Sequence, residues 1–300
     1  MSAPLLVVDA PFLLYRSFFA LPESITGAEG KPIGALLGGA NLLLRAAAER
    51  EPRAIVLCFG AEAAAYRVRL YAGYHAARPP VPEALQWQFD KAEEFFTGFG
   101  WHCRGAEDLE ADDLLGSYAL AEAAAGGSTL ILTGDRDMYQ CVGDHAAVLY
   151  LKQGSSGFET VDAEEVKRRY GIAPAQVPDF IALRGDPSDG LPGAPGIGEK
   201  TAAALLRGHD TLEGALKAVG TAAAPKLDSG ERPRVGAALR DNAEELRAFR
   251  EIALLRTVEL ERPPDAATDL SKAAKIAAAF GMGQLARRLE AATSLADLRT

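Results

Sequence analysis

The chain has 300 residues, of which 48% are hydrophobic and 24% charged, and its formal net charge at pH 7 is -9. This composition is typical of a folded globular protein and excludes a disordered chain. No apolar run approaches the roughly 18 residues needed to span a bilayer, and the three cysteines are far apart without CxxC spacing. We therefore expect a cytoplasmic protein with no membrane span, disulfide framework or zinc site.

The first 160 residues alternate short apolar runs with stretches rich in Ala and Leu. Apolar runs of this kind are typical of strands buried on both faces, and their alternation with helices predicts a mostly parallel sheet in an α/β fold. The expected strands are residues 5–9, 54–59, 129–133 and 147–151. The expected helices are residues 34–49, 82–99 and 111–125.

The rest of the chain carries no strand pattern. Gly and Pro separate stretches that predict helices at residues 162–169, 178–183, 200–207, 211–219, 234–257 and 271–279. We therefore expect two domains, an α/β domain over residues 1–160 and a helical domain over residues 161–300.

Eight acidic residues recur at four places, three of which lie where an apolar run gives way to a turn or helix. Open α/β sheets form their sites at the carboxyl ends of strands, so these side chains are expected to meet at one sheet edge. So many carboxylates cannot ionise together without counter-charge, which indicates bound divalent cations. The eight residues are Asp9, Glu110, Asp112, Asp113, Asp135, Asp137, Asp186 and Asp189.

The same acids account for much of the negative net charge of the chain. Shared around metal ions, they leave the rest of the chain near neutral, so the negative charge does not exclude a nucleic-acid partner. Each motif alone also has a structural explanation: helix-dipole acids in LEADD, turn chemistry in LTGDRD, and a helix cap for Asp9. Their coincidence in one α/β order favours the metal site.

Residues 183–204 are rich in Gly and Pro and open directly into a helix. Gly196 and Gly198 stand just before Glu199 and Lys200, with which that helix begins. A Gly-x-Gly entry exposes backbone N–H groups to which a phosphate can bind. The stretch predicts either a phosphate clamp or a structural loop between helices.

Five segments together resemble the 5′-3′ exonuclease domain of bacterial DNA polymerase I, within the flap endonuclease family. They are VVDAPFLLYRSFFALP, YRVRLYAGYHAARPPVP, LEADD, LTGDRDMYQ and RGDPSDGLPGAPGIGEKTA. The resemblance covers residues 5–260. It implies a PIN-like α/β nuclease lobe with a helical arch, and a helical lobe with a helix-hairpin-helix-type DNA clamp over residues 184–207.

The activity implied by this resemblance is that of a structure-specific 5′ nuclease, a 5′-3′ exodeoxyribonuclease and flap endonuclease. Such an enzyme hydrolyses DNA at 5′ ends, flaps or branches by a two-metal-ion mechanism with Mg²⁺ or Mn²⁺. The eight acids match the family's metal ligands, and His75 and Arg78 match basic positions of the arch. The residues expected to bind DNA are Arg16, Tyr74, His75, Arg78, Gly196, Gly198, Lys200 and Thr201.

Other expectations also rest on the family. Tyr74 would stack on a base near the scissile bond, and the hairpin would grip duplex phosphates, in the family often around a K⁺ ion. The resemblance implies replication and repair roles beside a polymerase and a ligase, and association with the nucleoid. In the polymerase such a domain is followed by far more chain, whereas this sequence ends at Thr300, so we expect a stand-alone nuclease and a monomer.

Two positions depart from the family pattern. The strand at residues 54–59 usually ends Phe-Asp but is followed here by Gly60, and the arch has His75 where the family has Lys. A neutral His supplies only a hydrogen bond where Lys supplies a permanent charge. Glu62 is a candidate to replace the missing acid.

The departures raise an alternative function, a branched-DNA-binding protein that has lost efficient catalysis. The retained acids weigh against it, because packed carboxylates repel DNA. A Toprim-type enzyme would account for Glu110, Asp135 and Asp137 but leaves RGDPSDG and the hairpin unexplained.

Overall fold

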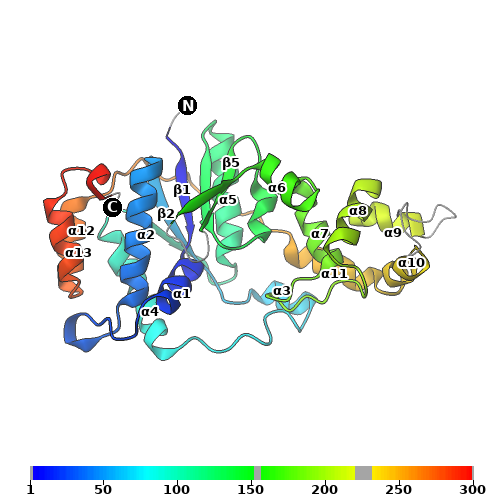
Figure 1. The fold of residues 1–300 in the computed structure, drawn as a ribbon, viewed down its shortest axis with the longest axis horizontal. Helices are drawn as coiled ribbons and strands as arrows, with labels where there is room; N and C mark the ends of the chain where they lie inside the picture. Colours follow the sequence, from blue (N-terminus) through cyan, green and yellow to red (C-terminus); the bar gives the residue numbers. More distant parts are fainter. Residues whose placement is uncertain (1–2, 152–156, 220–231, 299–300) are drawn as a thin grey trace.

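The computed structural model describes residues 3–151, 157–219 and 232–298 as a sheet lobe beside a helical lobe (Figure 1). The sheet has six strands in the order β3-β2-β1-β4-β5-β6. The first five are parallel, and β6 is antiparallel to β5. Their bounds are Leu5–Asp9 for β1, Ala54–Phe59 for β2, His102–Gly105 for β3, Thr129–Thr133 for β4, Ala146–Leu151 for β5 and Phe158–Val161 for β6.

The expected mostly parallel α/β fold is confirmed, with β1, β2 and β4 at their expected bounds. The sequence did not predict β3 and β6. Each has four residues, and their burial patterns include exposed positions, so neither shows the continuous apolar run that marks the inner strands.

β1 lies in the middle of the sheet, between β2 and β4. The chain moves outward from β1 through β2 to β3 and then continues with β4 on the other side of β1. Such a reversal opens a crevice at the carboxyl ends of the two strands that flank it. Asp9 ends β1 and Asp135 follows β4, so the topology alone brings two of the acidic places together.

Both faces of the sheet are buried. Leu5 and Val7 belong to one hydrophobic cluster and Leu6 and Val8 to the other, because successive strand residues point to opposite faces. Helix α5 (Ala111–Ala124) and the helical lobe cover the first face. Helices α1 (Ala10–Ala20), α2 (Gly34–Arg50) and α4 (Glu83–Thr97) cover the second.

The helical lobe contains helices α6 to α11. Their bounds are Ala163–Tyr170 for α6, Val177–Arg184 for α7, Glu199–His209 for α8, Leu212–Val219 for α9, Arg232–Asp241 for α10 and Ala243–Ala253 for α11. The single helix expected over residues 234–257 is wrong, because Asn242 separates α10 from α11. Its side-chain amide donates to the carbonyl oxygen of Ala238, and its backbone leaves helical geometry.

The last helices pack on the sheet lobe, at the opposite end of the molecule from α8 to α10 (Figure 1). In α12 (Leu270–Ala279) and α13 (Gly283–Ala291), Ala277 and Leu285 join the same hydrophobic cluster as Leu6. Residues 270–298 were expected within a helical domain over 161–300, and the structure places them elsewhere. Their small and branched apolar side chains fit α2 and α4, a pairing that sequence spacing does not reveal.

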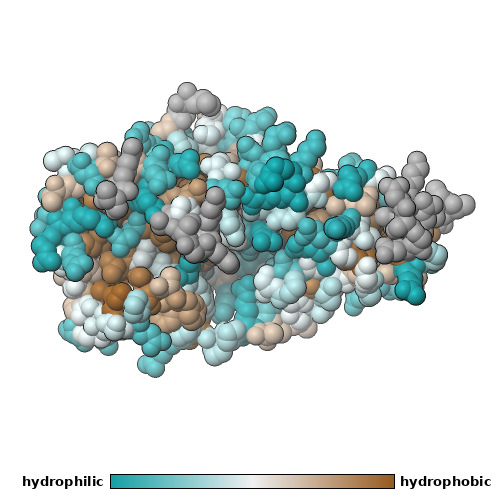
Figure 2. All heavy atoms as spheres, viewed as in Figure 1, coloured by the Kyte–Doolittle hydropathy of each residue, from teal (hydrophilic) through white to brown (hydrophobic). Residues whose placement is uncertain are grey.

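The surface reflects this arrangement. Figure 2 shows hydrophobic residues gathered on the sheet lobe near α1 and the lower ends of α2 and α13, and a hollow between this region and the helical lobe. Phe19 on α1 is 72% exposed. No helix in the described ranges is long and apolar enough to cross a membrane.

A buried ion-pair network joins the segment after α11 to the sheet lobe. Glu122 on α5 accepts hydrogen bonds from Arg53 Nε at 3.0 Å and from Arg262 Nε at 2.9 Å. Arg53 also donates to the carbonyl oxygen of Pro263 at 2.8 Å. Burial raises the pKa of Glu122, but the bonds from the two arginines outweigh it and hold the pKa below its usual value.

Glu122→Gln is expected to lower the free energy of unfolding by about 3 kcal/mol at pH 7, because Arg53 and Arg262 lose their shared carboxylate. The lowered pKa means that the carboxylate stabilises the fold above its unfolded pKa, and that this contribution is lost as pH falls through the folded pKa. The difference from the parent should therefore shrink below about pH 4. Urea unfolding at pH 7 and at acid pH measures it, with Glu244→Gln on the surface of α11 as the control. A difference that does not change with pH would contradict the assignment.

Candidate active site

A pocket of about 1020 Å³ lies at the carboxyl edge of the sheet. Its walls come from the ends of β1 and β2, the start of α5, the turn after β4 and the loop after α7. The chain between α3 (Ala65–Leu70) and α4 passes below this edge and closes one side (Figure 1). The acids expected at the site that line the pocket are Asp9, Glu110, Asp112, Asp135, Asp186 and Asp189.

Asp9 both caps α1 and faces the pocket. One carboxylate oxygen accepts from the backbone N of Phe12 at 3.0 Å, and the other from Thr133 Oγ1 at 2.8 Å. Thr133 Oγ1 also accepts from the backbone N of Asp135 at 3.0 Å. This threonine, which the sequence reasoning missed, joins the ends of β1 and β4; the only signal for it is a hydroxyl residue closing an apolar strand. Burial raises the pKa of Asp9 despite these bonds.

Asp135 and Asp137 lie in one turn, and the pKa of each carboxyl is raised. Asp135 Oδ1 accepts from the backbone N of Asp137 at 2.9 Å, so the turn explanation of this pair also holds. Burial and the neighbouring Asp189 raise the pKa of Asp135 to about 7. Asp137 is buried beside the pocket, and burial followed by Asp135 and Asp189 raises its pKa well above the usual range.

Asp112 is half-buried, and the pKa of its carboxyl is raised in the same way. Burial raises its pKa well above the usual value, and Asp135, Asp9 and Glu110 raise it further. Within the described ranges no donor hydrogen-bonds to its carboxylate. Asp9, Asp112, Asp135 and Asp137 are therefore one electrostatic group, which we call the uncompensated acids.

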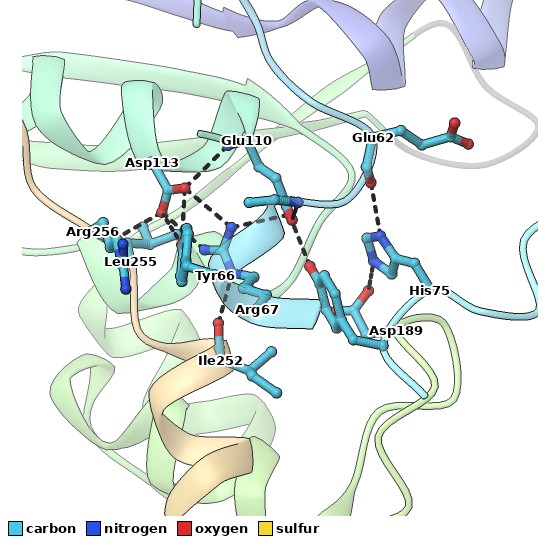
Figure 3. Close-up of polar contacts among 12 residues, drawn as sticks. Glu62, Tyr66, Arg67, His75, Glu110, Asp113, Asp189, Ile252, Leu255 and Arg256 are labelled. Atoms are coloured by element: carbon cyan, nitrogen blue, oxygen red, sulfur yellow. Dashed lines mark hydrogen bonds and ion pairs between the residues drawn. The ribbon is translucent and has the colours of Figure 1, made fainter. Parts of the chain in front are cut away.

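Asp113 was expected at the same site, and the structure places it behind the pocket instead (Figure 3). It is fully buried, and its carboxylate accepts from Arg67 Nη2 at 2.9 Å, Tyr66 Oη at 3.0 Å and the backbone N of Arg256 at 2.8 Å. Neighbouring residues of a helix point about 100° apart, so when Asp112 faces the pocket Asp113 cannot.

Arg67 is the main functional residue that sequence reasoning missed. Its guanidinium is 3% exposed and lies between Glu110, at 3.1 Å, and Asp113 (Figure 3). Its Nε donates to the carbonyl oxygen of Ile252 at the end of α11, at 2.9 Å. Burial lowers the pKa of Arg67, but the two acids more than reverse this. The sequence signal was an arginine within YRVRL, which spacing alone does not distinguish from a surface residue.

Tyr74 holds Glu110 in place. Its hydroxyl donates to Glu110 Oε2 at 2.8 Å, while Glu110 Oε1 accepts from the backbone N of Ala64 at 2.7 Å. The Tyr74 ring is 4% exposed and is stacked on the His75 ring, with centroids 3.8 Å apart. The structure thus covers the ring that was expected to stack on a base.

His75 and Arg78 both meet Asp189. His75 Nε2 lies 3.1 Å from Asp189 Oδ1, and Arg78 Nη2 lies 3.3 Å from the same oxygen. The other ring nitrogen of His75 donates to the carbonyl oxygen of Glu62 at 2.8 Å (Figure 3). Both basic residues line the pocket, and both are paired with one of its acids.

Neither residue 60 nor Glu62 supplies the acid that the family pattern has after β2. A Cβ at Gly60 would lie 2.4 Å from the backbone N of Ala111 and 2.5 Å from the carbonyl carbon of Glu110. An Asp at this position therefore requires the start of α5 to move. Glu62 lines the pocket, but Figure 3 shows its carboxylate pointing away from Glu110.

The expected DNA clamp lies on the helical lobe, outside the pocket lining. Gly196 has φ 77° and Gly198 precedes α8, while Ile197 between them is buried and anchors the turn. A Cβ at either glycine would meet no atom within 4 Å, so the backbone is open to a ligand. Lys200 and Thr201 lie in the first turn of α8. Arg16 is half-buried on α1 and does not line the pocket.

The donor set fits a hard divalent cation. The pocket acids offer only carboxylate oxygens, which suit Mg²⁺ and Mn²⁺, and mutual repulsion favours any added positive charge. As they stand, no three Asp, Glu, His or Cys side chains of the described residues are close enough to hold one ion. Binding would therefore draw these carboxylates closer together.

Two family models match the chain. One, described as 5′-3′ exonuclease, N-terminal resolvase-like domain, matches residues 4–171, and another, described as 5′-3′ exonuclease, C-terminal SAM fold, matches residues 172–275. A 5′-3′ exonuclease of Mycobacterium tuberculosis (strain ATCC 25618 / H37Rv) is 32% identical over 315 residues, which cover 97% of this chain and 98% of that protein.

Longer relatives match over part of their length. DNA polymerase I of Chloroflexus aurantiacus is 38% identical over 262 residues, which cover 86% of this chain. The chain spans only 27% of that polymerase.

Solved structures share the fold. The T5 5′-exonuclease with bound zinc has a TM-score of 0.65 at 15% identity, covering 95% of this chain and 96% of that one. The catalytic core of Rad2 in complex with DNA substrate has a TM-score of 0.64 at 14% identity, covering 96% and 90%.

Substitutions at Asp112 and Asp113 should have opposite effects on stability in the presence of a chelator. Asp113→Asn is expected to lower the free energy of unfolding by about 3 kcal/mol, because it leaves buried Arg67 with one partner fewer. Asp112→Asn is expected to raise it, because burial and neighbouring acids make this carboxylate unfavourable while it is ionised. Urea unfolding at pH 7 compares the two. If both variants lose a similar amount of unfolding free energy, Asp112 and Asp113 do not have the opposite effects on stability that we expect.

Proposed function

Because the chain belongs to the 5′-3′ exonuclease family, we propose that it is a structure-specific 5′ nuclease that hydrolyses DNA phosphodiesters at 5′ ends, flaps or branches. The single observation that carries this proposal is the group of uncompensated acids at the pocket. Buried carboxylates whose pKa values are raised by burial and by one another cluster at functional sites, and Asp112, Asp135 and Asp137 show both causes.

The uncompensated acids and Glu110 are the residues we assign to a first Mg²⁺ or Mn²⁺ ion, and Asp186 and Asp189 to a second. The chemistry that such ions supply when bound is positive charge that polarises a phosphodiester and acidifies water. Every donor in this assignment is an oxygen, as these cations prefer.

The chain's own residues position the reacting groups. Arg67 and Tyr74 hold the two oxygens of Glu110, and Thr133 fixes Asp9 against the turn after β4. Arg78, whose side chain is 40% exposed, can turn from Asp189 to a phosphate at the pocket mouth. Phosphate contacts of this kind orient DNA without reading its sequence.

The wall opposite the acids is apolar. Pro11, Phe12, Val81 and Phe89 line it together with Tyr15, whose ring packs edge-on against Phe89 with centroids 5.7 Å apart. A wall of this kind excludes water beside the acids and offers flat faces to nucleobases. An unpaired strand with its backbone toward the acids and its bases toward this wall fits both sides of the pocket.

Asp135→Asn is expected to abolish cleavage of a labelled 5′-flap duplex in Mg²⁺ or Mn²⁺ while DNA binding is kept, because it removes a cation ligand that is in charge contact with both Asp189 and Asp9. The assay compares cleavage and fluorescence anisotropy, with exposed Asp144→Asn as the matched control. Full cleavage by Asp135→Asn would overturn the assignment. A parent protein that binds the flap but never cuts it would instead favour the branched-DNA-binding function.

The hairpin is expected to bind duplex phosphates regardless of sequence. Gly198→Val should weaken binding, because valine accepts the backbone angles at this position but places methyl groups where a phosphate would approach. Lys200→Ala should reduce the slope of log affinity against log salt by about 1. Lys275→Ala on α12, far from the hairpin, is the control. Unchanged affinity of both hairpin variants at every salt concentration would make the hairpin a structural loop.

A further inference from the structure

Arg184 is a fixed positive charge at the edge of the pocket. It is the last residue of α7, and its Nη2 lies 3.2 Å from Asp186 Oδ2. Its Nε donates to the carbonyl oxygen of Gly185 at 3.1 Å, and its guanidinium lies over the Phe180 ring, 5.1 Å from the centroid. These three contacts hold the guanidinium in one place, with 19% of the side chain exposed.

Both oxygens of Asp186 are engaged. While Oδ2 faces Arg184, Oδ1 accepts from the backbone N of Ser188 at 2.9 Å and from the Ser188 hydroxyl. A cation that binds Asp186 must therefore share Oδ2 with the guanidinium or displace it. Asp189 is paired with His75 and Arg78, both through its Oδ1.

The two groups of pocket acids thus differ in charge balance. The uncompensated acids have neighbours that raise their pKa values, whereas Asp186 and Asp189 each have a basic partner within 3.3 Å. At the first group a divalent cation relieves the repulsion between neighbouring carboxylates. At the second group it meets a guanidinium that it repels, and at such separations this repulsion is worth several-fold or more in affinity.

We propose that Arg184 sets the balance between a divalent cation and a phosphate at the second acid pair. Its charge weakens a cation at Asp186 and Asp189 and strengthens a phosphate group held in the same part of the pocket. The inference rests on the proposed function, because it takes both ligands from there. In consequence the second cation binds weakly to the protein alone and gains affinity when DNA phosphates bring negative charge into the pocket.

The test measures two affinities that should change in opposite directions. Mn²⁺ binding to the protein without DNA is followed by electron paramagnetic resonance of the free ion, and Arg184→Gln is expected to tighten the weaker site by on the order of tenfold. Binding of a 5′-flap duplex in EDTA is followed by anisotropy. There the same variant should bind several-fold more weakly, with a salt slope smaller by about 1.

Two controls separate charge from structure. Arg184→Lys keeps the charge and should stay near the parent in both measurements. Arg168→Gln removes the same charge from the exposed surface of α6 and should change neither.

The outcomes distinguish a failure of the role proposed for Arg184 from a failure of the proposed metal centre. If Arg184→Gln leaves both affinities unchanged, or lowers both together, the role of Arg184 is overturned while the nuclease assignment stands. If the parent binds no Mn²⁺ at any concentration tested, the metal centre itself is overturned, and the role of Arg184 with it. A tighter ion and weaker DNA in the same variant is the result that supports it.

Discussion

Repulsion among carboxylates at one sheet edge is the constraint on which the rest of the site depends. Asp9, Asp112 and Asp135 come from three different elements, and burial raises the pKa of each, with neighbouring acids adding to this at Asp112 and Asp135. What holds them is the sealed core: β1 is buried on both faces, and the N-terminus of α5 packs on it. The stability of the sheet lobe keeps these like charges together. A bound cation would supply the positive charge that the carboxylates lack.

The helical lobe is joined to the back of the same site. Gln140, which follows the LTGDRD turn, donates to the carbonyl oxygens of Asp137 and Ala253 and accepts from the backbone N of Leu255. Arg67 adds its bond to Ile252. Residues 252–256 at the end of α11 thus contact both acidic turns of the sheet lobe. The lobe that carries the hairpin is therefore not a loose attachment, and its placement fixes where a bound duplex would lie relative to the acids.

Sequence reasoning succeeded where one local pattern decides the outcome. The bounds of β1, β2 and β4 follow from continuous apolar runs, and their carboxyl ends lead to Asp9 and Asp135. It failed where the outcome depends on what lies opposite a residue. Nothing local says that Asp113 meets Arg67, that the Tyr74 ring is covered by His75, or that residues 270–298 pack on the sheet lobe. The expected metal ligands and DNA contacts that line the pocket stay predictions until ligands are measured.

Both departures from the family pattern, Gly60 and His75, lie at close backbone contacts. Gly60 lies so close to the start of α5 that any side chain at this position would collide with the helix. Gly190 lies equally close to the chain between α3 and α4, because a Cβ on Gly190 would be 2.6 Å from the carbonyl oxygen of Gly73. Gly190 also has φ 77°, which disfavours other residues. Beside it, the backbone N of His75 donates to the carbonyl oxygen of Asp189 at 3.0 Å. Residues 73–75 and the loop of the second acid pair are therefore packed backbone against backbone, so the position of Asp189 depends on the path of the chain at residues 73–75.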